Sequence, residues 1–149
     1  MSGAALVIGV GNEFRRDDGV GLVVATAISD RALPGVRVMT AIGEPGSILE
    51  AWTGVPVAIA VDAAMGKGGT PGRIRRWTPD VDAETVIVSS HALGIPQTYA
   101  LGQALGQIPS KLVVFTVDVD DVGYGVGLTA AVANAVPVVA EAIVSELRD

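Results

Sequence analysis

Three short runs of almost purely aliphatic residues constrain the fold of this chain more than any other feature. They are Ala5–Val10 (ALVIGV), Val57–Val61 (VAIAV) and Lys111–Val117 (KLVVFTV). Continuous apolar runs of this length are typical of strands buried on both faces, as in parallel sheets covered by helices. Because 50% of the residues are hydrophobic and only 4% are aromatic, the core must be built mainly from Val, Ala, Leu and Ile. An α/β fold is therefore predicted.

Segments with helical periodicity separate these runs. From Asp18 onward, apolar residues recur on one helix face up to about Asp30. Thr129 is a good N-cap for a final helix that ends near Leu147. The other predicted elements are strands at Val36–Thr40, Arg73–Thr78 (an edge strand) and Thr85–Val88, and helices at Ser47–Trp52 and from Pro96 to about Leu105. This alternation predicts one domain over residues 1–149, with a twisted, mostly parallel sheet and helices on both faces.

Composition excludes several classes of function. The net charge is −6 and Lys and Arg together number only ten, whereas a phosphate backbone demands a basic surface, so no nucleic-acid partner is expected. There are no cysteines, which excludes disulfides and thiolate metal sites. We expect no secretory signal, because the start of the sequence has no basic region and only a very short apolar run. We expect no membrane span, because the longest apolar stretches are interrupted by Gly, Pro or charge. A cytoplasmic protein is the resulting expectation.

Three potential metal ligands or proton carriers follow strands of the predicted sheet. Asp18 lies in the loop after the first strand, Asp62 ends the third strand, and His91, the only histidine, follows the VIVSS run. In parallel sheets, ligands bind beyond the carboxyl ends of the strands, so these residues are predicted to share one site. Two carboxylates and one imidazole could hold a divalent metal with open positions, or activate a water as general base.

Each of these residues also has a purely structural interpretation. Asp18 could do no more than favour the positive end of the first helix, worth roughly 0.3–1 kcal/mol. Asp62 could cap a loop, and His91 could be a packed histidine that a backbone carbonyl satisfies. Taken together, three such residues at three loops of one sheet edge favour a functional site.

A nucleotide-dependent enzyme is a rival class of function. Gly9-Val10-Gly11 begins a dinucleotide fingerprint, but the third glycine is replaced by Phe14 and no acidic residue ends the second strand. The glycines are better explained by a tight turn between strand and loop. The sequence also lacks GxSxG, HExxH and a phosphate loop.

Five segments in order resemble a known family. Gly9-Val10-Gly11-Asn12 and Asp17-Asp18-Gly19-Val20-Gly21 resemble the opening motif of the hydrogenase maturation proteases. Asp62-Ala63 resembles the second motif of that family, and Ser90-His91-Ala92-Leu93-Gly94-Ile95-Pro96 resembles the third. The tail Gly127-Leu128-Thr129, followed by a helix rich in Val and Ala, is also similar, so the resemblance spans essentially the whole chain.

This resemblance implies both a fold and an activity. The family fold is a three-layer αβα sandwich of the phosphorylase/hydrolase-like type. Its members are endopeptidases that remove a C-terminal extension from the large-subunit precursor of [NiFe] hydrogenase once nickel is inserted. The family's acids map onto Asp18 and Asp62 and its histidine onto His91, and these contact a metal that stands for the nickel of the substrate. Nickel is thus expected to be borne by the precursor, with no tightly bound cofactor in the protease itself.

Two departures from the family pattern bear on this expectation. The aspartate that often follows the second strand is absent from residues 41–46, where Glu44 is close but displaced. The frequent Gly-Ile-Glu-Pro after the last strand is replaced by Asp118-Val119-Asp120. The missing aspartate leaves a second function open, a non-catalytic nickel-assembly checkpoint or diverged paralogue that binds the precursor without cutting it.

Two glycine-rich loops are expected to border the site. They are Met65–Gly72 and Asp118–Gly127, and glycine-rich segments carry high conformational freedom. We interpret both as candidate clamps for the substrate. In the expected reaction the nickel tethers the region to be cut, and either the metal or an aspartate activates the attacking water.

Overall fold

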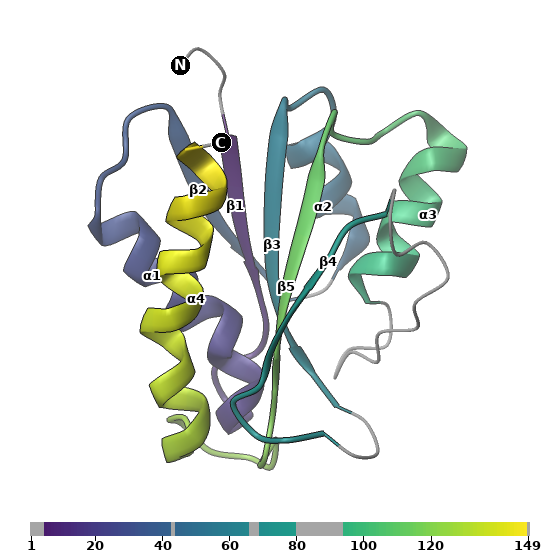
Figure 1. Cartoon of the computed structure of the whole chain (residues 1–149). Helices are drawn as coiled ribbons and strands as arrows, with labels where there is room; N and C mark the ends of the chain where they lie inside the picture. The colour runs from purple at the N-terminus through teal and green to yellow at the C-terminus, as the bar shows by residue number, and fades with distance from the viewer. Residues whose placement is uncertain (1–4, 43, 66–68, 80–93, 149) are drawn as a thin grey trace.

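The computed structural model describes residues 5–42, 44–65, 69–79 and 94–148. Figure 1 shows a central sheet with helices packed on both of its faces. The elements are β1 (Ala5–Val10), a 3-10 helix η1 (Arg16–Gly19), α1 (Val20–Asp30), β2 (Val36–Ala41), α2 (Pro45–Trp52), β3 (Val57–Ala64), β4 (Ile74–Trp77), α3 (Ile95–Leu105), β5 (Leu112–Asp118) and α4 (Ala130–Arg148).

The sheet has five strands in the order β2-β1-β3-β5-β4. All neighbouring pairs are parallel except β4 and β5, which are antiparallel. Helices α1 and α4 cover one face, and α2 and α3 cover the other (Figure 1). The predicted three-layer α/β fold with a mostly parallel sheet is confirmed, and the segment predicted as an edge strand is β4 at the edge of the sheet.

The first core lies between the sheet and the pair α1 and α4. Val7, Ile59 and Val113 of three adjacent strands point to this side. They pack with Val24 of α1 and Ile143 of α4, and all five side chains are at most 1% exposed. Burial of each such side chain stabilises the fold by roughly 1.5–3 kcal/mol.

The second core lies on the opposite face because successive strand residues point to opposite sides. Ile8, Ala60 and Val114 point toward α2 and α3. They pack with Trp52 of α2 and Ile95 of α3. These alternating sets explain why the three strands are continuously apolar in sequence: both of their faces are buried.

Two glycines let α1 lie directly on the sheet. A Cβ atom on Gly9 of β1 would lie only 2.2 Å from the carbonyl oxygen of Gly21 in α1. A Cβ atom on Gly21 would lie 2.5 Å from the carbonyl oxygens of Val10 and of Val61. The helix backbone therefore contacts the carboxyl ends of β1 and β3, and η1, which immediately precedes α1, is held at that edge.

Two strands continue further than the sequence predicted. We expected Asp62 to follow the third strand and Asp118 to begin a loop. Instead β3 runs to Ala64 and β5 to Asp118, because parallel pairing continues as far as Ala64 opposite Asp118. Both aspartates are thus part of the sheet. The predicted strand at 85–88 lies outside the described residues.

The last helix, α4, is long and apolar enough to cross a membrane by length and composition alone. The core helix of a water-soluble protein passes the same test. Here Val132, Val139 and Ile143 are buried against the sheet and α1. The apolar character of α4 is explained by this core packing and does not indicate a membrane protein.

Candidate active site

The carboxyl ends of the parallel strands hold two buried carboxylates. Asp18, on η1, is 1% exposed, and one of its oxygens, Oδ2, accepts a hydrogen bond from the backbone N–H of Asn12 at 3.0 Å. Asp62, on β3, is 2% exposed, and its Oδ1 accepts from the backbone N–H of Ala63 at 2.8 Å. A backbone donor therefore helps to orient each carboxylate.

Close packing of α1 brings these two aspartates to the same edge. Gly21 follows Asp18 by three residues and contacts the carbonyl oxygens of Val10 and Val61. Val61 is the residue directly before Asp62 in the chain. The predicted placement of both acids at the carboxyl edge of the sheet is consistent with this packing. Among the described residues, no group of three His, Cys, Asp or Glu side chains could hold a metal ion. His91 lies outside the described residues, so the three-residue site stays a prediction.

Asp62 belongs to a polar row that crosses three strands. It is two residues beyond Ala60 and so faces the layer of α2 and α3. Thr116 of β5 is its direct cross-strand neighbour, and Arg75 of β4 is the neighbour of Thr116 on the other side. The core of this face thus changes from apolar to polar as the strands approach their carboxyl ends.

Asp118 connects β5 to β4 and to the loop before it. The guanidinium of Arg75 binds the carboxylate with two hydrogen bonds, Nε to Oδ1 at 3.3 Å and Nη2 to Oδ2 at 3.2 Å. The backbone N–H of Thr70 donates to the same carboxylate at 3.1 Å. The alternating arginines of the edge strand could have suggested a surface role, but nothing in the sequence indicated that Asp118 was the partner of Arg75.

Asp17 is a fully buried hub that the sequence did not single out. Its Oδ2 accepts from the backbone N–H groups of Asp120 and Asp121, each at 3.0 Å, and from the hydroxyl of Thr129 at 2.7 Å. Its Oδ1 accepts from the N–H of Thr129 at 2.7 Å. Burial by itself raises the pKa of Asp17, but these hydrogen bonds outweigh it, so the pKa lies below the ordinary value of 3.8.

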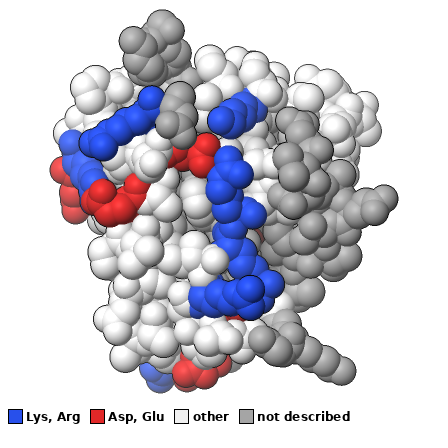
Figure 2. Space-filling model, in the orientation of Figure 1, with Lys and Arg blue, Asp and Glu red and all other residues white. Residues whose placement is uncertain are grey.

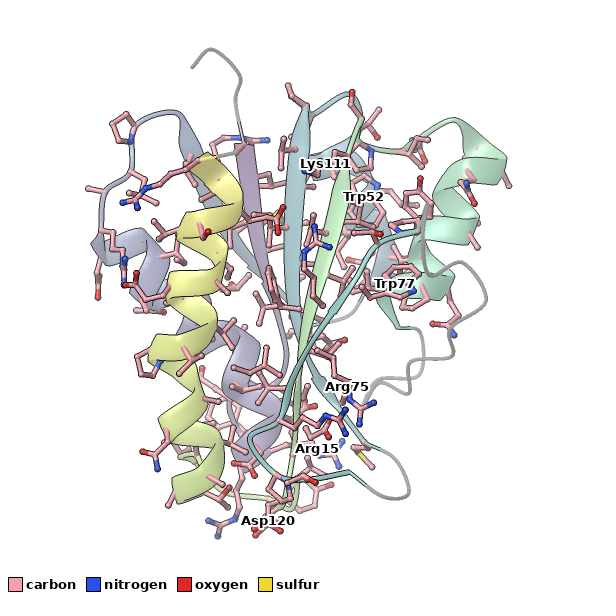
Figure 3. The ribbon with its side chains drawn as sticks, in the orientation of Figure 1. Arg15, Trp52, Arg75, Trp77, Lys111 and Asp120 are labelled. Atoms are coloured by element: carbon pink, nitrogen blue, oxygen red, sulfur yellow. The ribbon has the colours of Figure 1, made fainter. Side chains whose placement is uncertain are left out.

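The loop from β5 to α4 also pairs with the loop after β1 through their backbones. Gly125 donates to the carbonyl of Phe14 at 2.9 Å, and the N–H of Arg16 donates to the carbonyl of Gly125 at 2.9 Å. Nε of Arg15 donates to the carbonyl of Val122 at 3.0 Å. Figure 3 shows Arg15, Arg75 and Asp120 at the same end of the molecule. We call the paired segments 13–19 and 119–129 the two-loop platform.

A hollow of about 400 Å³ lies beside this platform, on the side of α1. Its apolar lining comes from Leu22 and Val23 of α1 and from Val126 and Leu128 of the platform. Phe14, Tyr124 and Val126 leave large apolar side chains exposed on the platform. The predicted glycine-rich loop at 118–127 is joined to the segment that carries Asp18 by the backbone pairing described above.

Glu44 occupies the region where the family pattern often has an aspartate. It is the N-cap of α2, and its Oε1 accepts from the backbone N–H of Ser47 at 3.3 Å. A negatively charged side chain at a helix N-terminus is favoured by the helix dipole. In this structure Glu44 is exposed and its side chain caps α2.

The fold is shared with several hydrogenase maturation proteases of known structure. The hydrogenase maturating endopeptidase HybD from E. coli superposes with a TM-score of 0.83 at 24% identity, covering 97% of this chain and 92% of that one. The [NiFe] hydrogenase maturation protease HybD from Thermococcus kodakarensis has a TM-score of 0.72 at 19% identity, covering 98% and 99%. HycI from the same organism has a TM-score of 0.71 at 20% identity, covering 98% and 93%.

The sequence matches the HycI family, described as hydrogenase maturation protease, over residues 32–146. A search among proteins with curated descriptions finds no match. The matched range includes Asp62 and His91 and covers most of the chain, including α2, β3, α3 and β5. The chain therefore belongs to the HycI family of hydrogenase maturation proteases.

Proposed function

We propose that this protein is an endopeptidase that removes the C-terminal extension of a nickel-loaded [NiFe] hydrogenase large-subunit precursor. The observation that carries the proposal is the pair of buried carboxylates, Asp18 and Asp62, at the carboxyl edge of a sheet with the fold of the maturation proteases. In open α/β sheets this edge is where ligands bind. Family membership supports a protease, and the precursor is the substrate that such a protease would process.

Asp18, Asp62 and His91 are the residues that we assign to the nickel carried by the precursor. Carboxylate oxygens are suitable ligands for a divalent cation, and both of these carboxylates are almost fully buried. Backbone hydrogen bonds from Asn12 and Ala63 help to orient the carboxylates before the metal arrives. A site with no thiolate and one imidazole is suited to reading a metal that the substrate already holds.

Cleavage would be an ordinary peptide hydrolysis, restricted to the bond that the nickel of the precursor tethers at the site. Water adds to the scissile carbonyl, the C–N bond breaks, and the departing amine takes a proton. The substrate's nickel can polarise the carbonyl or generate hydroxide, and a carboxylate of the site can take up the proton of the water. Because the tether holds the bond next to these groups, it can lower the barrier by several kcal/mol.

A non-catalytic binder is the second candidate function. The observation that favours it is the absence of an aspartate from residues 41–46, together with the use of Glu44 as the cap of α2. Such a protein would bind the precursor as a nickel-assembly checkpoint and leave its length unchanged. The same edge of the sheet would then serve recognition without hydrolysis.

The decisive experiment incubates the protein with precursor that has been loaded with nickel and, in parallel, with nickel-free precursor. Mass spectrometry should show loss of the C-terminal extension only from the loaded precursor. A stable complex with no change in mass would favour the binder. Equal cleavage of both forms would contradict the role of nickel, and neither binding nor cleavage would contradict both functions.

We propose a cytoplasmic protein without a nucleic-acid partner. Figure 2 shows a stripe of basic side chains on one face. Arg76 and Lys111 both pair with Glu146, and Arg75 pairs with Asp118. Acidic side chains of the same chain partly neutralise these three basic residues. The ion pairs are better explained by attachment of the edge strand to its neighbours than by binding of a phosphate backbone.

A further inference from the structure

Asp17 joins two segments that are more than a hundred residues apart in the sequence. Its carboxylate accepts four hydrogen bonds from Asp120, Asp121 and Thr129, and its own backbone N–H donates to the carbonyl of Asp121 at 2.9 Å. The side chain is 0% exposed, so its four bonds are made inside the protein. Asp17 is therefore the main polar connection within the two-loop platform.

The turn that carries Asp18 depends on this connection. The helix η1 has only four residues, and no side chain caps its N-terminus. Its first residue, Arg16, has a φ of 47°, a left-handed conformation that is uncommon outside glycine. Such a turn has little stability of its own, so its orientation is set by the groups that hold it. Asp17 and the pairing with Gly125 supply those groups.

Adjacent residues of a 3-10 helix point about 120° apart. Asp17 can therefore face the loop from β5 to α4 while Asp18 faces Asn12. A change in how Asp17 is held must rotate the turn, and that rotation moves the carboxylate of Asp18. The loop and Asp18 are thus mechanically coupled through the buried side chain of Asp17 together with the backbone pairing of the two segments.

We propose that Asp17 is a positioning residue of the protease: it locks η1 to the loop from β5 to α4 and thereby sets the position of the Asp18 carboxylate. This inference rests on the proposed function, because Asp18 is the residue that it serves. Asp17 itself is buried within the platform, where its carboxylate is bound by Asp120, Asp121 and Thr129, so it acts through Asp18. Its role is to keep Asp18 and the loop beside the site as one rigid unit.

Asp17→Asn is the substitution that tests this role. It keeps the shape of the side chain and exchanges one oxygen for an amide nitrogen. Both oxygens of Asp17 accept bonds from backbone N–H groups, so in either orientation the new NH₂ group faces a donor. The platform should open locally, and hydrogen exchange of the amides of Asp120, Asp121 and Thr129 should become more than about tenfold faster.

Activity separates positioning from simple stabilisation. At a temperature where the variant is fully folded, kcat on nickel-loaded precursor should fall by about a hundredfold, because a small displacement of a reacting group is sufficient for that loss. KM should change much less, because Asp17 is fully buried and offers no surface to the precursor. Asp30→Asn is the matched control: the same substitution at an exposed residue at the end of α1 should change neither quantity.

Thr129 provides a milder version of the same test. Thr129→Val removes the hydroxyl that donates to Asp17 and should give an intermediate fall in kcat, while Thr129→Ser keeps the hydroxyl and should restore wild-type kcat.

If Asp17→Asn lowers only the melting temperature and leaves kcat per folded molecule unchanged, the residue is merely structural and the inference is wrong. Unchanged amide exchange would also overturn it. If the wild-type protein cuts no precursor, the proposed function fails instead, and amide exchange still decides whether Asp17 locks the platform.

Discussion

Asp17 and Asp18 are chain neighbours with the same side chain and different surroundings. Asp17 accepts hydrogen bonds from a distant loop and is fully enclosed. Asp18 accepts from Asn12 next to the carboxyl ends of β1 and β3. At the scale of the residue, neighbouring positions in one short helical turn have different roles. Asp17 holds two segments of the chain together, and Asp18 belongs to the candidate site.

His91 carries the prediction that belongs to this scale. His91→Ala should abolish processing of nickel-loaded precursor and leave the melting temperature nearly unchanged, because a histidine that faces the substrate has little packing to lose. If His91 were a core residue, its removal would cost roughly 1–3 kcal/mol and lower the melting temperature by several degrees. Thermal denaturation and the mass assay distinguish the two outcomes, and a variant that melts early yet still cleaves would remove His91 from the site.

The element that determines the geometry of the site is α1. Its backbone lies on the carboxyl ends of β1 and β3 because Gly9 and Gly21 have no side chains in the contact. The same helix supplies Val24 and Ile28 to the core. The close approach therefore contributes to stability and at the same time fixes where η1 and Asp18 lie.

Gly21→Ala tests this dependence. The added Cβ would lie 2.5 Å from two backbone carbonyl oxygens, so α1 must move away from the sheet. We expect a loss of about 1–3 kcal/mol in the free energy of unfolding, measured by urea denaturation, together with reduced cleavage. Ser29→Ala is the control, because it adds no bulk at an exposed position of the same helix. An unchanged Gly21→Ala protein would show that the contact is not required.

At the scale of the whole molecule, ion pairs connect the edge strand to the last helix. Arg76 of β4 binds Glu146 of α4 at 2.8 Å, and Lys111, just before β5, lies 3.6 Å from the same carboxylate. The hydrogen bond from Arg76 lowers the pKa of Glu146 below 4.5; the charges of both basic residues add to this, whereas burial opposes it. The antiparallel edge is thus secured by its contact with a helix from the end of the chain.

This arrangement predicts how stability responds to acid. Since the folded-state pKa of Glu146 lies below 4.5, its contribution is present above that pH and is lost as the pH falls through the folded-state pKa. Glu146→Gln should lower the free energy of unfolding by about 1 kcal/mol at neutral pH and have a smaller effect near about pH 3. Urea denaturation at both values checks this, with the exposed Glu50→Gln as control. An equal effect at both values would contradict it.

The local properties of the sequence determined the fold class and most of the elements. The apolar runs predicted β1, β3 and β5 because strands buried on both faces need continuous apolar residues. Helical periodicity predicted α1 and α4 within one or two residues at each end. Acids and glycines after strands predicted which edge of the sheet would carry a site. These features depend on near neighbours in the chain, which a sequence displays directly.

Only the tertiary structure decided which distant residues are partners. The continuation of β3 past Asp62 depends on pairing with β5, and the role of Asp118 depends on Arg75 of an antiparallel edge strand. Glu44 caps α2, and Asp17 holds the loop that precedes α4. A carboxylate has the same composition in a cap, a hub or a catalytic site, and its role is set by which hydrogen-bond donors the fold brings within reach. That is why the sequence predicted a site at the carboxyl edge of the sheet but did not reveal that the buried Asp17 holds two of its loops together.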